Sequence, residues 1–457
     1  MDENINEKLL LEVEEDDTYQ HPCCPHGPTV LFYRQSQQPS DGFYACSAYR
    51  NPKLCSFRMD YEKWKGSQQK QAQDIRAYPQ QQNDADPDPT SHLKALSQDD
   101  VHAQYFFDQQ ALRFFADQCR LLKIDKVICM GAPRLHFHLR RICKIQSFLL
   151  DFDERFSKYL SPQEFCLYNM CNNHFFYHRE PFERFLKCNK DERVLIITDP
   201  PFGCRTELIA HTLRSLMRLH NRLNHLPVTP LSIFWVYPYY MANYIRQDMP
   251  ELQMCDYKIN YTNHSRYTNV GNSKRSYGSP VRIFTNVPLE LLRLPPGEGY
   301  KHCDRCQRDT AIENVHCDRC RNCCSQNGQT YRHCQLCDMC VKPNYVHCSN
   351  CRRCCQRVGH DCGLYQSMQH CWLCGQRGHI ESNCQIWSQL SRQTKRRQSQ
   401  RDCCLICGTR SHREKNCSRR CSYFKEFEFM GQTLIKAQDR KSMLTRNKAK
   451  IRKPPTV

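Results

Sequence analysis

Residues 194–198 (Val-Leu-Ile-Ile-Thr) form a short run rich in β-branched side chains, which ends abruptly in Asp199-Pro200-Pro201-Phe202. The run is too short for a helix of its own, so we expect a buried parallel strand whose carboxyl end opens into a loop. In α/β sheets, ligands bind at this end of the strands. Because two prolines stiffen the loop, the sequence predicts a binding site that presents Asp199 and Phe202 in a nearly fixed geometry.

Strand-like and helix-like stretches alternate through residues 101–297. Strands are expected at 126–130, 147–153, 169–176, 194–199, 231–237, 256–262 and 281–287. Apolar residues at helical spacing predict an amphipathic helix through 112–122, and a further helix is expected at 207–226. This alternation predicts an α/β domain with a mainly parallel sheet.

The charge and the cysteines indicate the kind of partner and the source of stability. The chain has 457 residues, a formal net charge of +19 and 34 cysteines. A strongly basic chain favours a polyanion, and nucleic acid is the simplest one. The chain has no apolar run of about 18 residues and begins with an acidic segment, so we expect a soluble intracellular protein rather than a membrane protein. In such a protein, cysteines interleaved with histidines at short spacings indicate zinc.

The quartet Asp199-Pro200-Pro201-Phe202 resembles the signature of S-adenosylmethionine-dependent amino methyltransferases, which methylate exocyclic nitrogens such as N6 of adenine. The resemblance implies a Rossmann-like class I methyltransferase domain. It also implies that the Asp199 side chain and the Pro200 carbonyl accept the N6 hydrogens while Phe202 stacks on the base. Much of the remaining rate would come from holding the amine in line with the methyl donor. The adenine would have to be flipped out of its stack with neighbouring bases. The alternative is an ordinary proline-rich turn.

In this interpretation, the loop after the first strand and the acids after the second bind the cofactor. Asp151 is the first choice to bond a ribose hydroxyl and Asp153 the second, although either can be a solvated loop acid. The amide-rich 169–176 segment can face the adenine, or it can be an ordinary strand edge. The candidate cofactor-binding residues are Gly131, Pro133, Arg134, Leu135, His136, Asp151, Asp153, Asn172 and Asp199.

The N-terminal part is expected to contain a flexible tail (1–20), a zinc finger (21–64) and a disordered, polar linker (65–100). Two ligand pairs on short strands predict a closed tetrahedral site, in which Cys23 can substitute for Cys24. The predicted ligands are Cys24, His26, Cys46 and Cys55. The segment resembles a GRF-type zinc finger, although the usual Gly-Arg-x-Phe is reduced to Gly42-Phe43.

Residues 301–363 contain an internal repeat, His-Cys-x2-Cys-x2-Cys, at 316–323, 333–340 and 347–354. With few apolar residues available, metal is expected to replace a hydrophobic core, at about four zinc ions. The layout resembles the cysteine-rich domain of DHHC acyltransferases, without their nucleophile motif or membrane helices. The predicted ligands are Cys303, Cys306, His316, Cys317, Cys320, Cys323, His333, Cys334, Cys337, Cys340, His347, Cys348, Cys351, Cys354, His360 and Cys362.

Two C-x2-C-x4-H-x4-C motifs follow, at 369–386 and 403–419, separated by a basic linker (387–402) and followed by a basic tail (420–457). These are CCHC zinc knuckles, which bind single-stranded RNA by base stacking, although a protein-binding role is the alternative. The basic segments can follow phosphates or act as a nuclear address. The predicted ligands are Cys371, Cys374, His379, Cys384, Cys404, Cys407, His412 and Cys417.

The order of these modules resembles one family, the zinc-finger CCHC-domain ribosomal RNA adenine-N6 methyltransferases. The resemblance implies S-adenosylmethionine and several zinc ions as cofactors. It also implies methylation of one adenosine in large-subunit ribosomal RNA, and a nuclear and nucleolar location with the cytoplasm as a further one. The alternative to an enzyme is a non-catalytic RNA-binding protein that keeps the methyltransferase fold as a scaffold.

Overall fold

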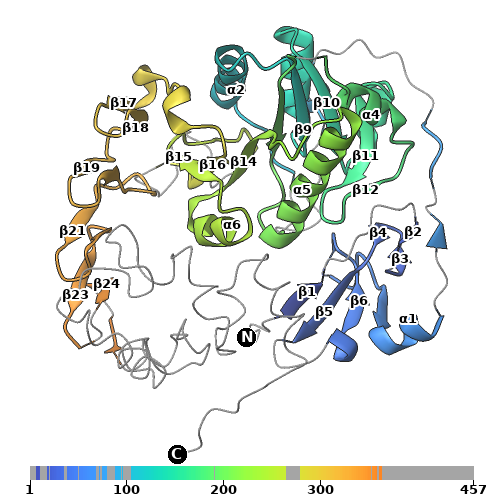
Figure 1. Ribbon diagram of the computed structural model, residues 1–457, viewed down its shortest axis with the longest axis horizontal. Helices are drawn as coiled ribbons and strands as arrows, with labels where there is room; N and C mark the ends of the chain where they lie inside the picture. Colours follow the sequence, from blue (N-terminus) through green and yellow to red (C-terminus); the bar gives the residue numbers. More distant parts are fainter. Residues whose placement is uncertain are drawn as a thin grey trace, which may run out of the picture. The chain divides into compact units, whose positions relative to one another are not determined.

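The computed structural model divides the chain into two compact units (Figure 1). Unit 1 comprises Met1–His302 with Arg308–Thr310, and unit 2 comprises Cys303–Gln307 with Ala311–Val457. The structure describes residues 7–10, 18–19, 21–34, 39–49, 51–67, 71–72, 75–79, 88–93, 95, 104–189, 191–263, 278–350, 353–357 and 360–362. Within these ranges, no helix has both the length and the apolar character needed to cross a membrane.

An eight-stranded sheet forms the centre of unit 1. Its order is β12-β11-β10-β9-β13-β14-β16-β15. The strands are β9 (Lys126–Met130), β10 (Gln146–Asp151), β11 (Phe165–Asn169), β12 (His174–Phe175), β13 (Val194–Thr198), β14 (Ser232–Pro238), β15 (Gln253–Cys255) and β16 (Val281–Thr285). The five strands from β11 to β14 are parallel, whereas β12 and β16 are antiparallel to their neighbours. This is the predicted Rossmann-like α/β architecture of a class I methyltransferase.

The chain reverses its direction of travel across the sheet at β9. From β9 it proceeds to β10 and β11 on one side, and it then returns to β13 on the other side. The carboxyl ends of β9 and β13 therefore lie next to each other, with Thr198 paired to Met130. In open α/β sheets such a switch point is where ligands bind. The sheet thus places the loop after Met130 against the Asp199 loop.

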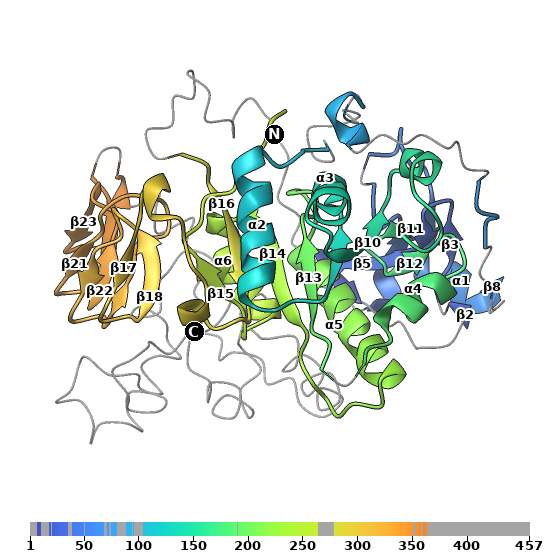
Figure 2. The ribbon, with the colours of Figure 1, turned by 90° about the horizontal axis from the view of Figure 1, so that it is seen from above.

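Helices cover both faces of this sheet (Figures 1 and 2). One face carries α4, α5 and α6, which contact one another in sequence, and the other carries α2 and α3. The helices are α2 (Gln109–Leu121), α3 (Pro133–Phe137), α4 (Glu180–Leu186), α5 (Thr206–Leu223) and α6 (Ala242–Asp248). Asp108 caps the N-terminus of α2, because its side chain accepts the Ala111 N–H at 2.8 Å. The Phe114 ring of this helix stacks on Tyr257.

Most predicted strands of the domain are confirmed, and two needed correction. The predicted strand at 169–176 is instead the end of β11, a turn and β12. The prediction at 256–262 is wrong, because the strand is β15 and the following segment forms only an isolated bridge between Tyr261 and Phe107. Tyr257, Ile259 and Tyr261 are all buried. Their alternation is real, but it reflects packing of an irregular segment against the core rather than ladder pairing.

The N-terminal finger also belongs to unit 1. A four-stranded antiparallel sheet has the order β1-β5-β6-β7, and small two-stranded sheets pair β3 with β4 and β2 with β8. The elements are β1 (Glu7–Leu10), β2 (Thr18–Tyr19), β3 (Cys23–Cys24), β4 (Gly27–Pro28), β5 (Val30–Arg34), β6 (Phe43–Ala45), β7 (Arg58–Asp60), α1 (Tyr61–Ser67) and β8 (Gln71–Ala72). Leu31, Tyr33 and Tyr44 form a small core.

Two predictions of unstructured sequence were wrong for the residues described. Within the expected tail, residues 7–10 are paired with β5. Within the expected linker, the Arg76 N–H donates to the Phe176 carbonyl at 2.8 Å and the Tyr78 hydroxyl donates to the Leu160 carbonyl at 2.9 Å. A polar segment of low apolar content is therefore ordered here by contacts to a surface that its own composition does not reveal.

The described part of unit 2 is built from short β-hairpins rather than from a hydrophobic core. Their strands, some of which begin in unit 1, are β17 (Tyr300–Cys303), β18 (Arg308–Ala311), β19 (His316–Cys317), β20 (Asn322–Cys323), β21 (Arg332–Cys334), β22 (Met339–Val341), β23 (Tyr345–Cys348) and β24 (Arg353–Gln356). In three of the hairpins a histidine lies directly opposite a cysteine: His316 and Cys323, His333 and Cys340, His347 and Cys354.

Candidate active site and zinc sites

The loop after β13 carries the Asp-Pro-Pro-Phe quartet and is fixed by backbone hydrogen bonds. The Asp199 N–H donates to the Met130 carbonyl at 3.1 Å. The Tyr237 hydroxyl, at the end of β14, lies 3.1 Å from the Phe202 carbonyl and 2.6 Å from the Cys204 carbonyl. Both ends of the loop are therefore attached to neighbouring strands, as the rigid presentation expected from the prolines requires.

The Asp199 carboxyl group is held by a tyrosine from a distant part of the chain. Its Oδ1 accepts a hydrogen bond from the Tyr261 hydroxyl at 2.9 Å. Burial raises the pKa of this carboxyl well above its usual range, while the Tyr261 hydrogen bond acts in the opposite direction. Among the described residues no Lys or Arg pairs with this carboxyl group, so a structural ion pair does not account for its position.

Three tyrosines surround Phe202, an arrangement that was not predicted. Tyr237 and Tyr261 contact its ring edge-on, with centroids 5.7 and 6.2 Å away. Tyr105, from the segment before α2, lies at 6.4 Å. Such a cluster offers flat apolar faces suited to a purine base. The three tyrosines come from distant parts of the chain, and only Tyr237 and Tyr261 lie within predicted strands.

Gly131 lies where the first strand meets the catalytic loop. Its φ is +70°, and a Cβ there would lie 2.6 Å from Cε of Met170 and 2.9 Å from the Asp199 carbonyl oxygen. Its N–H donates to the Leu150 carbonyl at 2.9 Å. Glycine is therefore needed both for the backbone conformation and for the close approach. The absence of a side chain here allows the loop after β9 to lie directly against the Asp199 backbone.

Asp151 and Asp153 have different environments at the end of β10. Asp153 forms an ion pair with Arg155 at 2.7 Å, so its carboxylate already has a structural partner. Asp151 accepts the Asp153 N–H at 2.9 Å. Burial, assisted by the Asp153 charge, raises the pKa of Asp151 to about 7. Asp153 is thus engaged in an ion pair, and Asp151, the first choice, stays the predicted acceptor for a ribose hydroxyl.

Of the residues predicted after Gly131, two lie in the core. Leu135 is fully buried in α3. His136 is also fully buried, with Nδ1 2.9 Å from the Ser147 hydroxyl, and burial lowers its pKa to about 3. Pro133 occupies the first turn of α3, where its missing N–H does no harm. The structure therefore gives Leu135 and His136 a packing role in place of the predicted cofactor contact.

Arg134, also a predicted cofactor residue, is engaged with the chain itself. Its Nη1 donates to the Phe107 carbonyl at 2.9 Å and to the Thr262 hydroxyl at 3.3 Å, and its Nε lies 3.4 Å from Asp88. These contacts join the segments on either side of the Tyr261 bridge. Arg134 thus helps to hold Tyr261, which contacts Asp199, in place.

Asn172, a predicted cofactor residue, contacts the zinc finger. Its Nδ2 donates to the carbonyls of His26 at 3.1 Å and Pro28 at 2.8 Å, both in the zinc finger. Asn169 also donates to the His26 carbonyl, at 2.8 Å. The turn between β11 and β12 is therefore where the finger attaches to the domain. The Asn169 and Asn172 side chains therefore hold the finger loop that contains His26 and Pro28.

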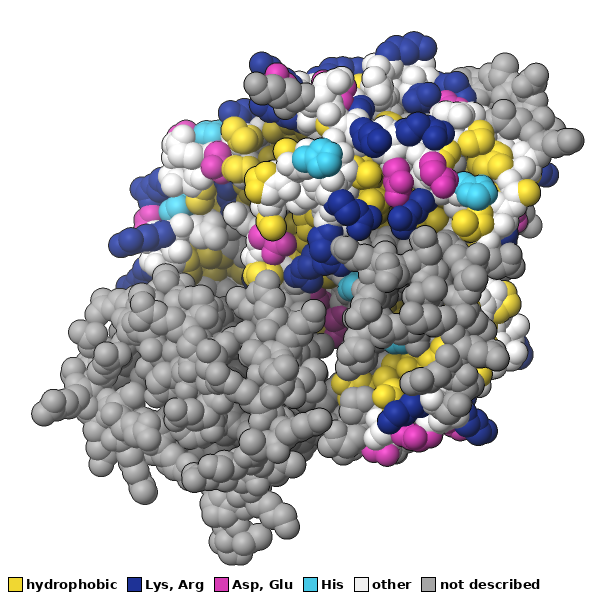
Figure 3. All heavy atoms as spheres, turned by 45° about the vertical axis from the view of Figure 1, so that its right-hand side comes forward, with side chains coloured by type: hydrophobic (Ala, Val, Ile, Leu, Met, Phe, Trp, Pro, Cys, Tyr) yellow, Lys and Arg dark blue, Asp and Glu magenta, His cyan; other side chains and the backbone are white. Residues whose placement is uncertain are grey.

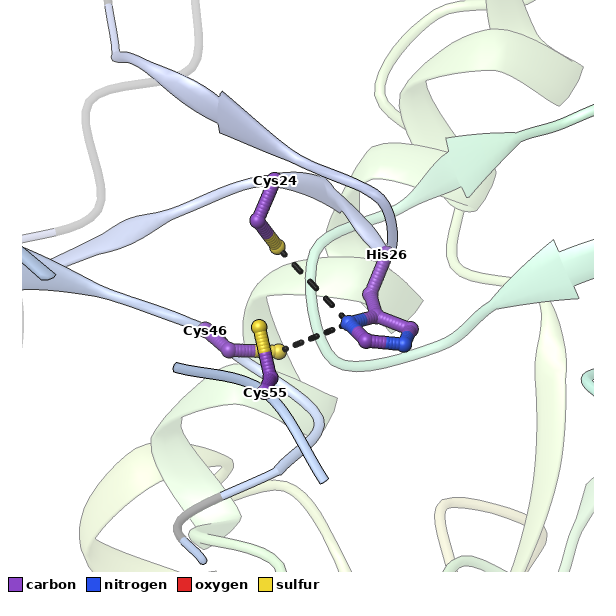
Figure 4. A group of neighbouring side chains, drawn as sticks. All are labelled: Cys24, His26, Cys46 and Cys55. Atoms are coloured by element: carbon purple, nitrogen blue, oxygen red, sulfur yellow. Dashed lines mark hydrogen bonds between the residues drawn. The ribbon is translucent and has the colours of Figure 1, made fainter. Parts of the chain in front are cut away.

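The finger brings its four predicted ligands together. Cys24, His26, Cys46 and Cys55 place their ligand atoms within 4.8 Å of one another. In Figure 4 the Sγ atoms of Cys24 and Cys46 lie 3.9 and 3.5 Å from Nδ1 of His26. Cys23 is not part of the group and its Sγ lies 4.0 Å from the His21 carbonyl. Three thiols and one imidazole suit a tetrahedral zinc ion, with Cys24 as the first ligand.

The cysteine-rich unit shows how its repeats share metal sites. The first two repeats each give their histidine and last cysteine to one group and their first two cysteines to the next group. The third repeat gives His347 and Cys354 to one group and Cys348 to the next. The groups are Cys303, Cys306, His316 and Cys323; Cys317, Cys320, His333 and Cys340; Cys334, Cys337, His347 and Cys354; and Cys348, His360 and Cys362. The chain therefore forms a ladder of interleaved zinc sites. Cys351, also a predicted ligand, lies outside the described residues, as do both knuckles and the basic tail.

The parallel sheet and the Asp-Pro-Pro-Phe loop at its switch point are those of an S-adenosylmethionine-dependent N6-adenine methyltransferase. Comparison with known proteins agrees. The family model described as "Probable N6-adenine methyltransferase" matches residues 98–286. The human protein named rRNA N(6)-adenosine-methyltransferase ZCCHC4 is 35% identical over 446 residues, covering 83% of this chain and 86% of the human protein. The Xenopus laevis protein of the same name is 37% identical over 439 residues, covering 82% and 88%. The chain belongs to this family of zinc-containing methyltransferases.

Proposed function

We propose that this chain transfers a methyl group to N6 of an adenosine in large-subunit ribosomal RNA. The relatives are named for methylation of adenosine in ribosomal RNA, and the large subunit is the target implied by the module order. The observation that carries the proposal is the Asp199 carboxyl group, which is held by Tyr261 at the switch point of the sheet, beside Gly131 and the tyrosines around Phe202.

The site can activate an aryl amine by accepting its hydrogens. S-adenosylmethionine supplies the electrophilic methyl group when bound. Because Tyr261 occupies Oδ1 of Asp199, Oδ2 is the oxygen left for one N6 hydrogen, and the Pro200 carbonyl accepts the other. Because the raised pKa of Asp199 favours its neutral form, its capacity to accept a hydrogen from N6 should increase as the pH rises. Phe202 would hold the base so that the amine and methyl carbon are in line.

The zinc modules and the basic charge would hold the RNA. The finger is attached directly to the β11–β12 turn, next to the catalytic domain's ligand edge. On the face drawn in Figure 3, Lys and Arg side chains occur throughout the described surface, among apolar and acidic ones. With a formal net charge of +19, binding to phosphates is favoured and should weaken as salt rises. The two knuckles would add base stacking of about 1–3 kcal/mol per base.

A nuclear and nucleolar location, with the cytoplasm as a further site, fits a substrate that is assembled into ribosomes in the nucleolus. The basic tail supplies a sequence that can act as a nuclear address. A fluorescent fusion of the full chain, compared with one lacking residues 440–453, tests this. Identical distributions of the two fusions would show that the tail is not the address.

The function is tested with the purified zinc-loaded chain, labelled S-adenosylmethionine and large-subunit ribosomal RNA. Nucleoside mass spectrometry should detect N6-methyladenosine. Asp199→Ala should remove at least about 99% of the rate, the scale expected for loss of a positioned general base, with RNA affinity nearly unchanged. Asp117→Ala, at an exposed surface carboxylate, is the matched control. Equal loss of RNA binding and turnover in Asp199→Ala would contradict the assigned role.

A further inference from the structure

Two cysteine thiols lie in contact beside the catalytic loop. Sγ of Cys171 lies 3.2 Å from Sγ of Cys204. Cys171 belongs to the turn between β11 and β12, and Cys204 belongs to the same loop as Asp199. Neither sulfur is a member of the Cys/His groups that suit zinc. Among the described residues, the zinc groups therefore do not explain why these two sulfurs lie in contact.

The two thiols differ in access to solvent. Cys171 is buried, whereas Cys204 is partly exposed. A small oxidant can therefore reach Cys204 first, and Cys171 is already placed to react with the product. Redox-sensitive cysteines usually consist of an accessible thiol next to a resolving thiol.

The two segments that carry the thiols are held in different ways. The Cys171 N–H donates to Asn169 Oδ1 at 2.9 Å, and Asn169 is itself bonded to the zinc finger. The neighbouring Met170 carbonyl accepts the Thr212 hydroxyl at 2.8 Å, which fixes the turn to α5. Cys204 lies in the catalytic loop and is attached through its carbonyl to Tyr237. A covalent link would tie this loop to a rigid, finger-bound turn.

We propose that Cys171 and Cys204 form a peroxide-sensitive dithiol, which closes to a disulfide and slows methyl transfer. The regulatory half of this proposal rests on the proposed function. The Cys204 thiolate attacks hydrogen peroxide, the O–O bond breaks, and a sulfenic acid and hydroxide form. The Cys171 thiol then attacks that sulfur, the S–S bond forms, and water leaves with the Cys171 proton and the sulfenic hydroxyl. A dithiol reductant reverses the reaction by exchange.

The size of the effect follows from the distance that the sulfurs must move. A disulfide has an S–S bond of about 2.05 Å, so the thiols must approach by roughly 1 Å from their present separation. Misplacement of a reacting group by about 1 Å can cost about 10²-fold in rate. We therefore expect the oxidised protein to be slower by between about 10-fold and 10²-fold.

The bond itself is tested on the full zinc-loaded chain. Peroxide is added below the dose that releases zinc, free thiols are alkylated, and peptides are identified by mass spectrometry. A linked peptide pair containing Cys171 and Cys204, lost on treatment with dithiothreitol, is expected. Absence of this pair, when other thiols of the chain are oxidised, would overturn the proposal.

The functional half is tested with matched variants, each compared with its own unoxidised rate on RNA. Wild type and Cys143→Ser, at another partly exposed thiol outside the zinc groups, should lose activity reversibly. Cys171→Ser and Cys204→Ser should lose less than twofold. Equal loss in all four proteins would refute the regulatory role.

A readout that needs no RNA separates this proposal from the proposed function. Amide hydrogen exchange over residues 199–206 should slow in oxidised wild type and not in Cys204→Ser. Unchanged exchange in a protein that contains the disulfide would refute the tether, whatever the activity on RNA. Slower exchange in a protein that never methylates RNA would support the tether and count against the proposed function alone.

Discussion

Gly131 provides the sharpest test of how the fold builds the active site. In Gly131→Ala, the new Cβ would lie 2.9 Å from the Asp199 carbonyl oxygen, which is backbone and cannot rotate away. The contact at 2.6 Å with Cε of Met170 involves the end of a flexible side chain and is cheaper to relieve. The substitution therefore displaces the catalytic loop, and that displacement has both a stability and a rate consequence.

The magnitude has two parts. A non-glycine residue at a φ of +70° costs about 1–2 kcal/mol. Overpacking against fixed backbone costs about 1–3 kcal/mol more. The free energy of unfolding should thus fall by about 2–5 kcal/mol, and a shift of the Asp199 loop by about 1 Å should lower the methylation rate by about 10²-fold.

Substitutions at two other glycines separate the backbone cost from the overpacking cost. Gly299 has a φ of +89° with nothing within 4 Å of a built Cβ, so Gly299→Ala measures the backbone cost alone. Gly297 also has nothing within 4 Å and no positive φ, so Gly297→Ala is the baseline. Urea unfolding and methylation rates are measured for all three variants. If Gly131→Ala matched Gly299→Ala in stability and kept the wild-type rate, the close approach of the two loops would be refuted.

Three further predictions concern the base, the cofactor and the metal. Phe202→Ala should lower the methylation rate far more than Phe202→Tyr, because only an aromatic ring can stack on the adenine; equal rates would exclude stacking. Since burial raises the pKa of Asp151 to about 7, its carboxylate form, the acceptor for a ribose hydroxyl, gains population as pH rises through 7. Affinity for S-adenosylmethionine by calorimetry should therefore increase from pH 6 to pH 8, and Asp151→Asn should flatten this dependence. Removal of zinc by a chelator should make residues 303–362 sensitive to protease before the central sheet, because metal replaces their core; simultaneous cleavage of both would contradict this.

Local features of the sequence determined the chemistry that depends on residues close together in the chain. The strand before Asp199 and its proline-stiffened loop follow from β-branched burial and fixed φ, and both were expected at their observed positions. The ligands of the finger were also predictable, because pairs of cysteine and histidine at short spacing already set most of the geometry around one metal ion.

Only the tertiary structure decided what depends on residues distant in the chain. The hydrogen bonds from Asn172 to the finger could not be predicted, because the docking of one module on another leaves no periodic signal. The Tyr261 contact to Asp199 and the contact between Cys171 and Cys204 likewise arise from the order of strands in the sheet. In the cysteine-rich unit, spacing identified the ligands, but hairpin pairing decided that each repeat divides its ligands between two sites.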